Sequence, residues 1–186
     1  MIITIAGKPC CGKSTTAELF SKKFNFDRIN TGAIFKDKAK EMGKNVLELC
    51  SSDDAIKIDY QVDNELKNIY NSRLNDDLII ESRTSWSFMP EAFNVYLDVD
   101  DDVIASRLFN SDRTGKEKAE SLEQAKVMAM SRYKADCDRY KKIYNIDCTN
   151  LHNYDFVLNN SNLTPDETAD KIYEAYLEYL NKKLQK

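Results

Sequence analysis

The sequence has no long apolar run, and this absence excludes one class of protein. A helix that crosses a bilayer needs about 20 consecutive apolar residues, and the 186-residue chain offers no such stretch although 42% of its residues are hydrophobic. The first apolar segment begins at Ile2 with no basic region before it, so we expect no cleavable signal peptide. A membrane is therefore not an expected partner.

An excess of positive charge is also absent. Asp and Glu outnumber Lys and Arg by 31 to 27, which gives a formal net charge of −4. Proteins that bind a nucleic-acid polymer usually carry a basic surface, so we do not expect a polymer of this kind as the main partner. A small anionic ligand needs only a few basic groups, and the overall charge leaves such a ligand open.

Cysteine is too sparse and too irregular for a disulfide framework or a zinc site. The five cysteines include one adjacent pair, and no C-x-x-C pair occurs. They are Cys10, Cys11, Cys50, Cys137 and Cys148. A reducing compartment suits such thiols, and we therefore expect a cytoplasmic protein.

Five short apolar runs are typical of strands in a parallel sheet. The run Ile2–Ala6 is almost continuously apolar, as a strand buried on both faces requires. Longer stretches with helical spacing separate the runs, and this alternation predicts an α/β fold with helices on both faces of the sheet. The predicted strands are Ile2–Ala6, Phe26–Ile29, Leu78–Ile80, Phe93–Leu97 and Phe156–Leu158.

Two charged helical stretches interrupt this alternation, at about 36–75 and at about 107–144. Neither contains proline, and the chain has no internal repeat or low-complexity tract, so we expect one domain over residues 1–186. Insertions near the carboxyl edge of a parallel sheet lie where ligands bind. Further along, Thr164, Pro165 and Glu167 predict the start of the last helix.

The segment Gly7–Ser14 matches the pattern G-x-x-x-x-G-K-[ST] at every defined position, between a predicted strand and a predicted helix. Gly7 and Gly12 permit backbone angles that let consecutive N–H groups point into one anion-binding nest. In such a P-loop, we expect Lys13 to contact the β- and γ-phosphates of ATP and the hydroxyl of Ser14 to bind Mg²⁺. The expected ATP-binding residues are Gly7, Lys8, Pro9, Cys10, Cys11, Gly12, Lys13, Ser14 and Thr15.

Cys10 and Cys11 occupy variable positions of this loop. One interpretation is that the two cysteines are simply small residues, which the loop tolerates beside a phosphate. The other is a redox switch, because a helix N-terminus lowers the pKa of a thiol.

Three further stretches follow the P-loop in a fixed order. Residues 30–36 read NTGAIFK, residues 80–83 read IESR, and residues 132–147 include Arg132, Arg139-Tyr140 and the run YNID. Together with the P-loop, these stretches resemble the cytidylate kinase family, especially its short, archaeal-type members. The resemblance covers roughly Ile2 to Ile172 and implies a P-loop kinase fold with the strand order 2-3-1-4-5.

The resemblance also implies the roles of several residues. Residues 36–75 would bind a nucleoside monophosphate, and residues 107–144 would contain a lid. Arg83 would grip the acceptor phosphate, with Thr31, Gly32 and Lys36 beside the substrate. The lid arginines Arg107, Arg113, Arg132 and Arg139 would surround the transferring phosphoryl group or the adenine end of ATP. We expect Lys13, Arg83, Arg132 and Arg139 to take part in catalysis, and Arg107 and Arg113 to contact ATP.

Helical spacing supports part of this interpretation. Arg132, Asp136 and Arg139 fall on one face of a predicted helix, so two guanidiniums can enter one cleft. The planar fork of arginine suits phosphate. The alternative is a solvated ladder of charges on an exposed helix face.

The acceptor side departs from the family at two positions. Lys36 stands where the family has arginine, and Ser82 stands where it has glycine; Ser82 would narrow or reshape the acceptor pocket. Asp59 and Asp63 lie four residues apart on a predicted helix, where they would accept hydrogen bonds from an amino-bearing base. The alternative is that both are exposed helix residues.

These features predict ATP-dependent phosphoryl transfer to a nucleoside monophosphate, preferably CMP or dCMP, by a monomer that uses ATP and Mg²⁺. Lys36 and Ser82 favour one alternative, a kinase of the same fold that acts on another small molecule. A second alternative is a nucleotide-binding module that has lost transfer activity.

Overall fold

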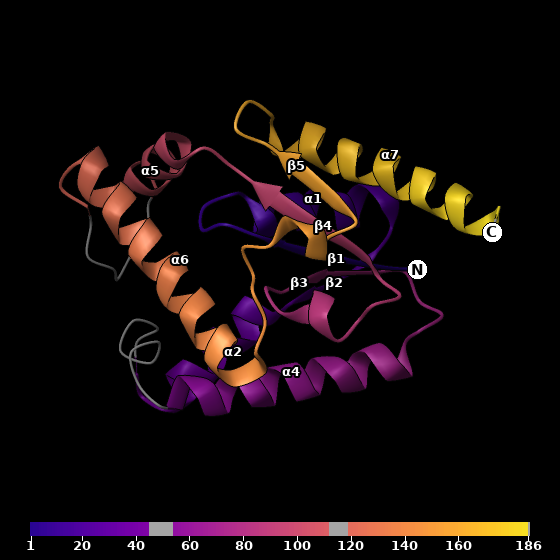
Figure 1. Ribbon diagram of the computed structural model, residues 1–186, viewed down its shortest axis with the longest axis horizontal. Helices are drawn as coiled ribbons and strands as arrows, with labels where there is room; N and C mark the ends of the chain where they lie inside the picture. Colours follow the sequence, from indigo (N-terminus) through magenta and orange to yellow (C-terminus); the bar gives the residue numbers. More distant parts are fainter. Residues whose placement is uncertain (45–53, 112–118, 186) are drawn as a thin grey trace.

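A computed structural model describes residues 1–44, 54–111 and 119–185, which contain a five-stranded parallel sheet (Figure 1). The order is β2-β3-β1-β4-β5, so the predicted fold and strand order are confirmed. The observed strands begin and end within about one residue of the predicted runs. They are β1 (Ile2–Gly7), β2 (Asp27–Asn30), β3 (Leu78–Glu81), β4 (Phe93–Asp98) and β5 (Phe156–Asn159).

Strand β1 lies in the middle of the sheet because its residues can be buried on both sides. Ile3 is the register partner of Ile79 in β3 and of Phe93 in β4, and every residue of β1 is buried. The sheet places the carboxyl ends of β1, β3 and β4 along one edge. The loops that leave this edge carry the P-loop and the segment that begins at Ser82.

Alternation along the strands divides the core between the two faces. Ile3 and Ile5 pack in one cluster with Phe20 of α1 (Lys13–Phe24) and Ile172 of α7 (Pro165–Leu184). On the other face, Leu78 and Ile80 pack with Leu66 of α4 (Asp54–Ser72). Figure 1 shows α1 and α7 on one side of the sheet and α4 on the other.

The last helix begins as the sequence predicts. The Thr164 hydroxyl accepts a hydrogen bond from Glu167 N at 3.2 Å, and the Glu167 carboxylate accepts one from Thr164 N at 2.8 Å. This capping box satisfies two N–H groups that the helix leaves unpaired, and Pro165 occupies the first turn.

The inserted stretches are helical where the structure describes them. The first contains the end of α2 (Thr31–Glu41) and all of α4, and the second contains the end of α5 (Asp101–Phe109) and all of α6 (Leu122–Tyr144). The C-terminal end of α6 meets α4, since the Tyr60 hydroxyl donates to Ile143 O at 3.2 Å. Short 3-10 turns follow β3 and precede β5, at η1 (Ser85–Ser87) and η2 (Leu151–Asn153). Among the described ranges, no helix is both long enough and apolar enough to cross a membrane.

Candidate active site

The loop between β1 and α1 is built around two glycines in the left-handed half of backbone space. Gly7 has a φ of 147°, and a Cβ atom at this position would lie 2.3 Å from the carbonyl oxygen of Leu97 in β4. Gly12 has a φ of 86° and precedes the first turn of α1. Only glycine fits position 7 without displacing β4. The loop therefore has the backbone geometry of a P-loop, with the N-terminus of α1 at its end.

Lys13 is folded onto this loop. Its ammonium donates to the carbonyl oxygens of Gly7 at 3.1 Å and Lys8 at 3.2 Å. Burial lowers the pKa of Lys13, and the nearby charge of Arg83 lowers it further. Two cations therefore approach each other at the carboxyl edge of the sheet, and an anion between them would relieve their repulsion.

The side chain of Lys8 is directed to β4. Its ammonium lies 2.9 Å from Asp98 Oδ1 and 3.5 Å from Asp101 Oδ1. Burial by itself would lower the pKa of Lys8, but the hydrogen bond and charge of Asp98, aided by Asp101, raise it. Because two carboxylates hold its ammonium, we expect Lys8 to serve a bound phosphate through its backbone.

Arg107 lies behind the P-loop. Its guanidinium donates to Cys10 O at 3.3 Å and to Asn160 O at 3.1 Å, and it braces the loop backbone in this structure. The other arginine predicted for the ATP side, Arg113, lies outside the described residues.

One cleft of about 620 Å³ brings together the predicted donor and acceptor residues. It extends from the P-loop past the carboxyl end of β3 to α6. The predicted residues on its wall are Pro9, Cys10, Lys13, Ser14, Thr31, Gly32, Lys36, Asp59, Asp63, Arg83, Arg132 and Arg139. The wall does not include Gly7, Lys8, Cys11, Gly12, Thr15 or Arg107.

A chain of buried ion pairs crosses this cleft. The Arg83 guanidinium pairs with Asp136, whose other carboxylate oxygen lies 3.0 Å from Arg139. Arg139 Nε in turn donates to Asp59 Oδ2 at 2.7 Å. Asp136 is only 3% exposed. The solvated ladder is therefore wrong for Asp136 and Arg139, because both side chains line the cleft and are paired.

The wall of the cleft also contains a buried carboxylate on α4. Asp63 is 6% exposed and accepts a hydrogen bond from the Thr84 hydroxyl at 3.0 Å. Burial raises the pKa of Asp63, and burial likewise raises that of Asp59 in spite of its pairing with Arg139. The alternative that these two are exposed helix residues is wrong.

Ser82 supports the turn that carries Arg83. Its hydroxyl accepts hydrogen bonds from Thr84 N at 3.2 Å and Ser85 N at 3.1 Å, and the side chain is 5% exposed. The hydroxyl is therefore used within the turn that leads to η1. Lys36, by contrast, is exposed on α2 at the rim of the cleft.

Two charged residues of the cleft had no assigned role in the sequence. Glu81 is buried at the end of β3 and pairs with Arg28 Nε at 2.6 Å, while the Thr31 hydroxyl donates to its carbonyl oxygen at 2.7 Å. Asp136 entered the sequence argument by its spacing alone. Its place on the same helical face as Arg132 and Arg139 was the signal that could have identified it as their partner.

Known proteins are similar to this chain in sequence and in fold. A family model described as "AAA domain" matches residues 3–128, more than half of the chain. A cytidylate kinase from Sulfurisphaera tokodaii is 35% identical over 183 residues and covers 97% of each chain. A cytidylate kinase from Natronomonas pharaonis is 36% identical over 184 residues, which are 96% of this chain and 91% of that protein.

A solved structure agrees at the level of the fold. Shikimate kinase from Bacteroides thetaiotaomicron matches with a TM-score of 0.64 at 16% identity, over 96% of this chain and 98% of its own. Such low identity supports a shared P-loop kinase fold and says nothing of the acceptor. The near-complete coverage by relatives more than 30% identical decides the family. The chain therefore belongs to the cytidylate kinase family.

Proposed function

We propose that this protein transfers the γ-phosphoryl group of ATP to the phosphate of CMP or dCMP, with Mg²⁺ as cofactor. One observation carries the proposal: a single cleft joins Lys13 and Ser14 of the P-loop to the arginines Arg83 and Arg139. Phosphoryl transfer needs this arrangement, because donor and acceptor are both anions and must be held in line. The cytidylate kinase relatives over nearly the whole chain support the choice of acceptor.

The residues of the P-loop fit ATP and Mg²⁺. The close approach of Gly7 to β4 and the left-handed Gly12 give the loop the backbone geometry of a cradle of N–H groups for phosphate. Ser14 lies in the first turn of α1, on the wall of the cleft, where its hydroxyl would hold the metal. The bound ion would neutralise charge on the phosphates. Arg107 and Arg113 would serve the ATP end.

The acceptor phosphate would take the place of the Asp136 carboxylate, which is paired with Arg83 and Arg139 in the ligand-free protein. Asp136 holds Arg83 and Arg139 together; we propose that the monophosphate takes over these guanidiniums. The accepting oxygen is already ionised, so no general base is required. Arg132 and Lys13 would stabilise the negative charge that spreads over the phosphoryl group in transit.

The base would lie against α4. Asp63 and Thr84 form a hydrogen-bonded pair on the cleft wall, and Asp59 lies one helical turn away. Carboxylates at these positions would accept hydrogen bonds from the amino group of cytosine. The Ser82 hydroxyl is hydrogen-bonded within the turn after β3, so this side chain would not block the space for the base. Thr31, Gly32 and Lys36 at the start of α2 would border the acceptor.

The same proposal covers the organisation of the chain. Residues 1–186 would form one domain and act as a monomer. Within it, residues 36–75 would bind the monophosphate and residues 107–144 would contain a lid that excludes water during transfer.

The test is a direct assay of acceptors. The purified protein is incubated with ATP–Mg²⁺ and each of CMP, dCMP, UMP and AMP, and the diphosphate product is measured. We expect CMP or dCMP to give the highest kcat/KM, and Lys13→Ala to lower it by about 10²–10³-fold. Lys22→Ala is the control, because Lys22 is an exposed lysine of the same helix, paired with Glu18.

Each other outcome identifies an alternative. Formation of no diphosphate from any of the four acceptors contradicts the proposal. Tight ATP binding without turnover would favour a nucleotide-binding module. A different phosphorylatable metabolite that stabilises the protein would favour another acceptor, since a ligand at 100 times its Kd adds roughly 2.7 kcal/mol of stability.

A further inference from the structure

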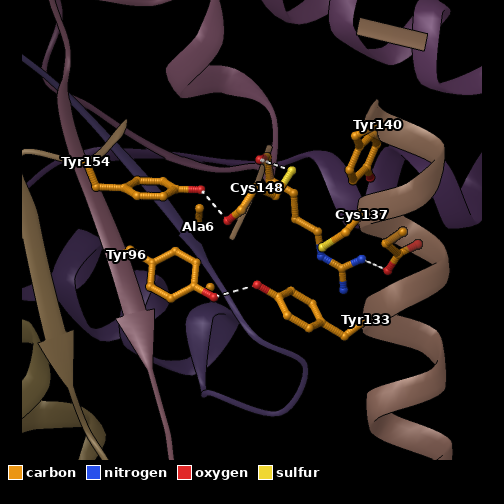
Figure 2. A pocket seen from close by; sticks show the side chains of 10 residues that line it. Ala6, Tyr96, Tyr133, Cys137, Tyr140, Cys148 and Tyr154 are labelled. Atoms are coloured by element: carbon orange, nitrogen blue, oxygen red, sulfur yellow. Dashed lines mark hydrogen bonds and ion pairs between the residues drawn. The ribbon is translucent and has the colours of Figure 1, made fainter. Parts of the chain in front are cut away.

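A small second pocket lies beside the cleft and shares Arg83, Asp136 and Tyr140 with it. Its volume is about 10 Å³, enough for one water molecule. Figure 2 shows that two cysteines, Cys137 and Cys148, line this pocket. Nothing in the proposed phosphoryl transfer uses either thiol.

The two thiols reach the pocket from different segments. Cys137 lies on α6, immediately after Asp136 and two residues before Arg139. Cys148 lies beyond the end of the helix and is only 5% exposed. Its sulfur is 4.0 Å from the carbonyl oxygen of Arg83. Cys148 is thus in contact with the backbone of the residue proposed to hold the acceptor phosphate.

The chain is shaped to bring Cys148 back to the helix. Asn145 ends α6 in the left-handed conformation with a φ of 55°, which reverses the direction of the chain. The Asp147 carboxylate then accepts hydrogen bonds from Thr149 N at 2.9 Å and from the Thr149 hydroxyl at 2.6 Å. The Tyr154 hydroxyl donates to Cys148 O at 3.4 Å (Figure 2). Cys148 is therefore held in place by its own turn.

The surroundings make the two thiols chemically unequal. A hydrogen bond with Cys148 is the largest influence that lowers the pKa of Cys137, to about 7, and Tyr133 and the charge of Arg83 act in the same direction. The same hydrogen bond, followed by burial, raises the pKa of Cys148. A thiol that ionises near neutral pH beside one that stays protonated is the arrangement of a nucleophilic and a resolving cysteine.

We propose that Cys137 and Cys148 form a reversible intramolecular disulfide. This bond would act as a lock that ties α6 to the turn that contains Cys148, next to the backbone of Arg83. The oxidant is a peroxide. The Cys137 thiol loses its proton, and the thiolate attacks one peroxide oxygen. The O–O bond breaks, a sulfenic acid forms, and the hydroxide that leaves takes up a proton to become water. The Cys148 thiol then attacks this sulfur. The S–O bond of the sulfenic acid breaks as the S–S bond forms, and the hydroxyl leaves as a second water with the proton of the Cys148 thiol. Two thiols are oxidised by two electrons, and one hydrogen peroxide is reduced to two waters.

The lock would act on the helix that carries the acceptor network. Arg132, Asp136 and Arg139 all project from α6, and the exchange of Asp136 for a substrate phosphate requires small movements of this helix. A covalent tie between Cys137 and the turn at Cys148 would restrain these movements. This consequence rests on the proposed function, whereas formation of the disulfide does not.

The disulfide is tested first by peptide mapping of the full chain. The protein is treated with hydrogen peroxide, alkylated, digested and analysed by mass spectrometry, with and without later reduction by dithiothreitol. We expect one cross-linked peptide that joins Cys137 to Cys148 and disappears on reduction. Sulfinic acid on Cys137 without a cross-link, or a cross-link confined to Cys10 and Cys11, would overturn the proposal.

The lock is tested by activity and by two matched variants, Cys137→Ser and Cys148→Ser. We expect peroxide to lower kcat of the parent about tenfold or more, with recovery in dithiothreitol, and to leave Cys137→Ser unaffected. Loss of activity that persists in Cys137→Ser would locate the sensitive thiol elsewhere and overturn the lock. If the variants do not fold, the map of the parent chain still decides whether the disulfide forms. A cross-linked protein that phosphorylates no nucleotide would contradict the proposed function and leave the disulfide standing.

Discussion

Arg83 and Asp136 form an ion pair although 53 residues separate them in the sequence. Arg83 follows the end of β3 and Asp136 lies on α6, so the pair joins the central sheet to the helix that carries the other cleft arginines. The carboxylate is almost fully buried, and a buried ion pair is stable only while both partners remain. Under the proposed function, a substrate phosphate would displace Asp136 because it offers the same guanidiniums a doubly charged anion.

Replacing Arg83 by lysine should weaken acceptor binding. Lysine keeps the charge but loses the bidentate fork that matches a phosphate. We expect KM for the monophosphate to rise about 10- to 100-fold, with the Kd for ATP nearly unchanged. Steady-state kinetics and an ATP titration measure the two effects.

Arg73→Lys is the matched control for this variant, because Arg73 lies far from the cleft wall and pairs with Asp76 at 2.6 Å near the surface. Equal KM values for Arg83→Lys and the parent would mean that Arg83 does not hold the acceptor. Loss of ATP binding in Arg83→Lys would point instead to a role on the donor side.

Replacing Asp136 by asparagine should destabilise the ligand-free protein. The substitution leaves Arg83 and Arg139 facing each other without their bridging charge, and removal of one partner from a buried ion pair typically costs about 3–5 kcal/mol. Urea denaturation measures the loss. We expect CMP together with a non-hydrolysable ATP analogue to restore more stability to the variant than to the parent, because the phosphates supply the missing anion.

The control is Asp138→Asn, an exposed residue on the same helix. It should change the free energy of unfolding by less than about 0.5 kcal/mol. If the two variants lose the same stability, Asp136 does not bridge the arginines in solution.

Asp63→Asn should alter how stability depends on pH. Burial raises the pKa of Asp63 above its ordinary value of 3.8, so the folded state binds this proton more tightly than the unfolded chain does. The resulting stabilisation is fully present below about pH 3.8 and is lost as pH rises through the higher folded pKa. Asparagine cannot titrate, so the advantage of the parent over the variant should shrink as pH rises.

This difference is measured from unfolding free energies of both proteins between roughly pH 4 and pH 7. Glu65→Gln, which removes an exposed carboxylate from the same helix, is the matched control. An advantage of the parent that grows with pH would mean that Asp63 is held in its charged form by the fold.

Cys137 should react with iodoacetamide at an unusually low pH. The thiolate is the reactive form, so the rate should rise with pH and reach half its plateau near pH 7, where the pKa of Cys137 lies, instead of near its ordinary value of 9.0. Alkylation rates from peptide mapping at a series of pH values give the midpoint. Tyr133→Phe removes the hydroxyl that, together with the Cys148 thiol, stabilises the thiolate, and should shift the midpoint upward. The same midpoint in folded and urea-unfolded protein would show that the pocket does not activate the thiol.

The parts of the structure that depend on local sequence were predicted well. The apolar runs gave the strands, Thr164 and Glu167 gave the start of α7, and the glycines at positions 7 and 12 gave the P-loop. Each of these signals involves residues close together in the chain. The strand order followed from the family resemblance, since apolar runs alone do not say which strands are neighbours.

Contacts between distant segments escaped prediction. The burial of Asp59 and Asp63 depends on α6 lying beside α4, and no local pattern in α4 reveals that neighbour. The pairing of Cys137 with Cys148 depends on the left-handed Asn145 that turns the chain back. The orientation of the Lys8 side chain depends on Asp98 of β4, and that of the Arg107 side chain depends on Asn160. Both partners are far away in the sequence.

The contact between Gly7 and Leu97 has a consequence for engineering. A Cβ atom at position 7 would lie 2.3 Å from the Leu97 carbonyl oxygen. The P-loop therefore tolerates no larger residue at this position. The acceptor wall comes from other segments: α2, α4 and the turn after β3. A library that aims to change which monophosphate is accepted should therefore diversify those segments and keep residue 7 constant.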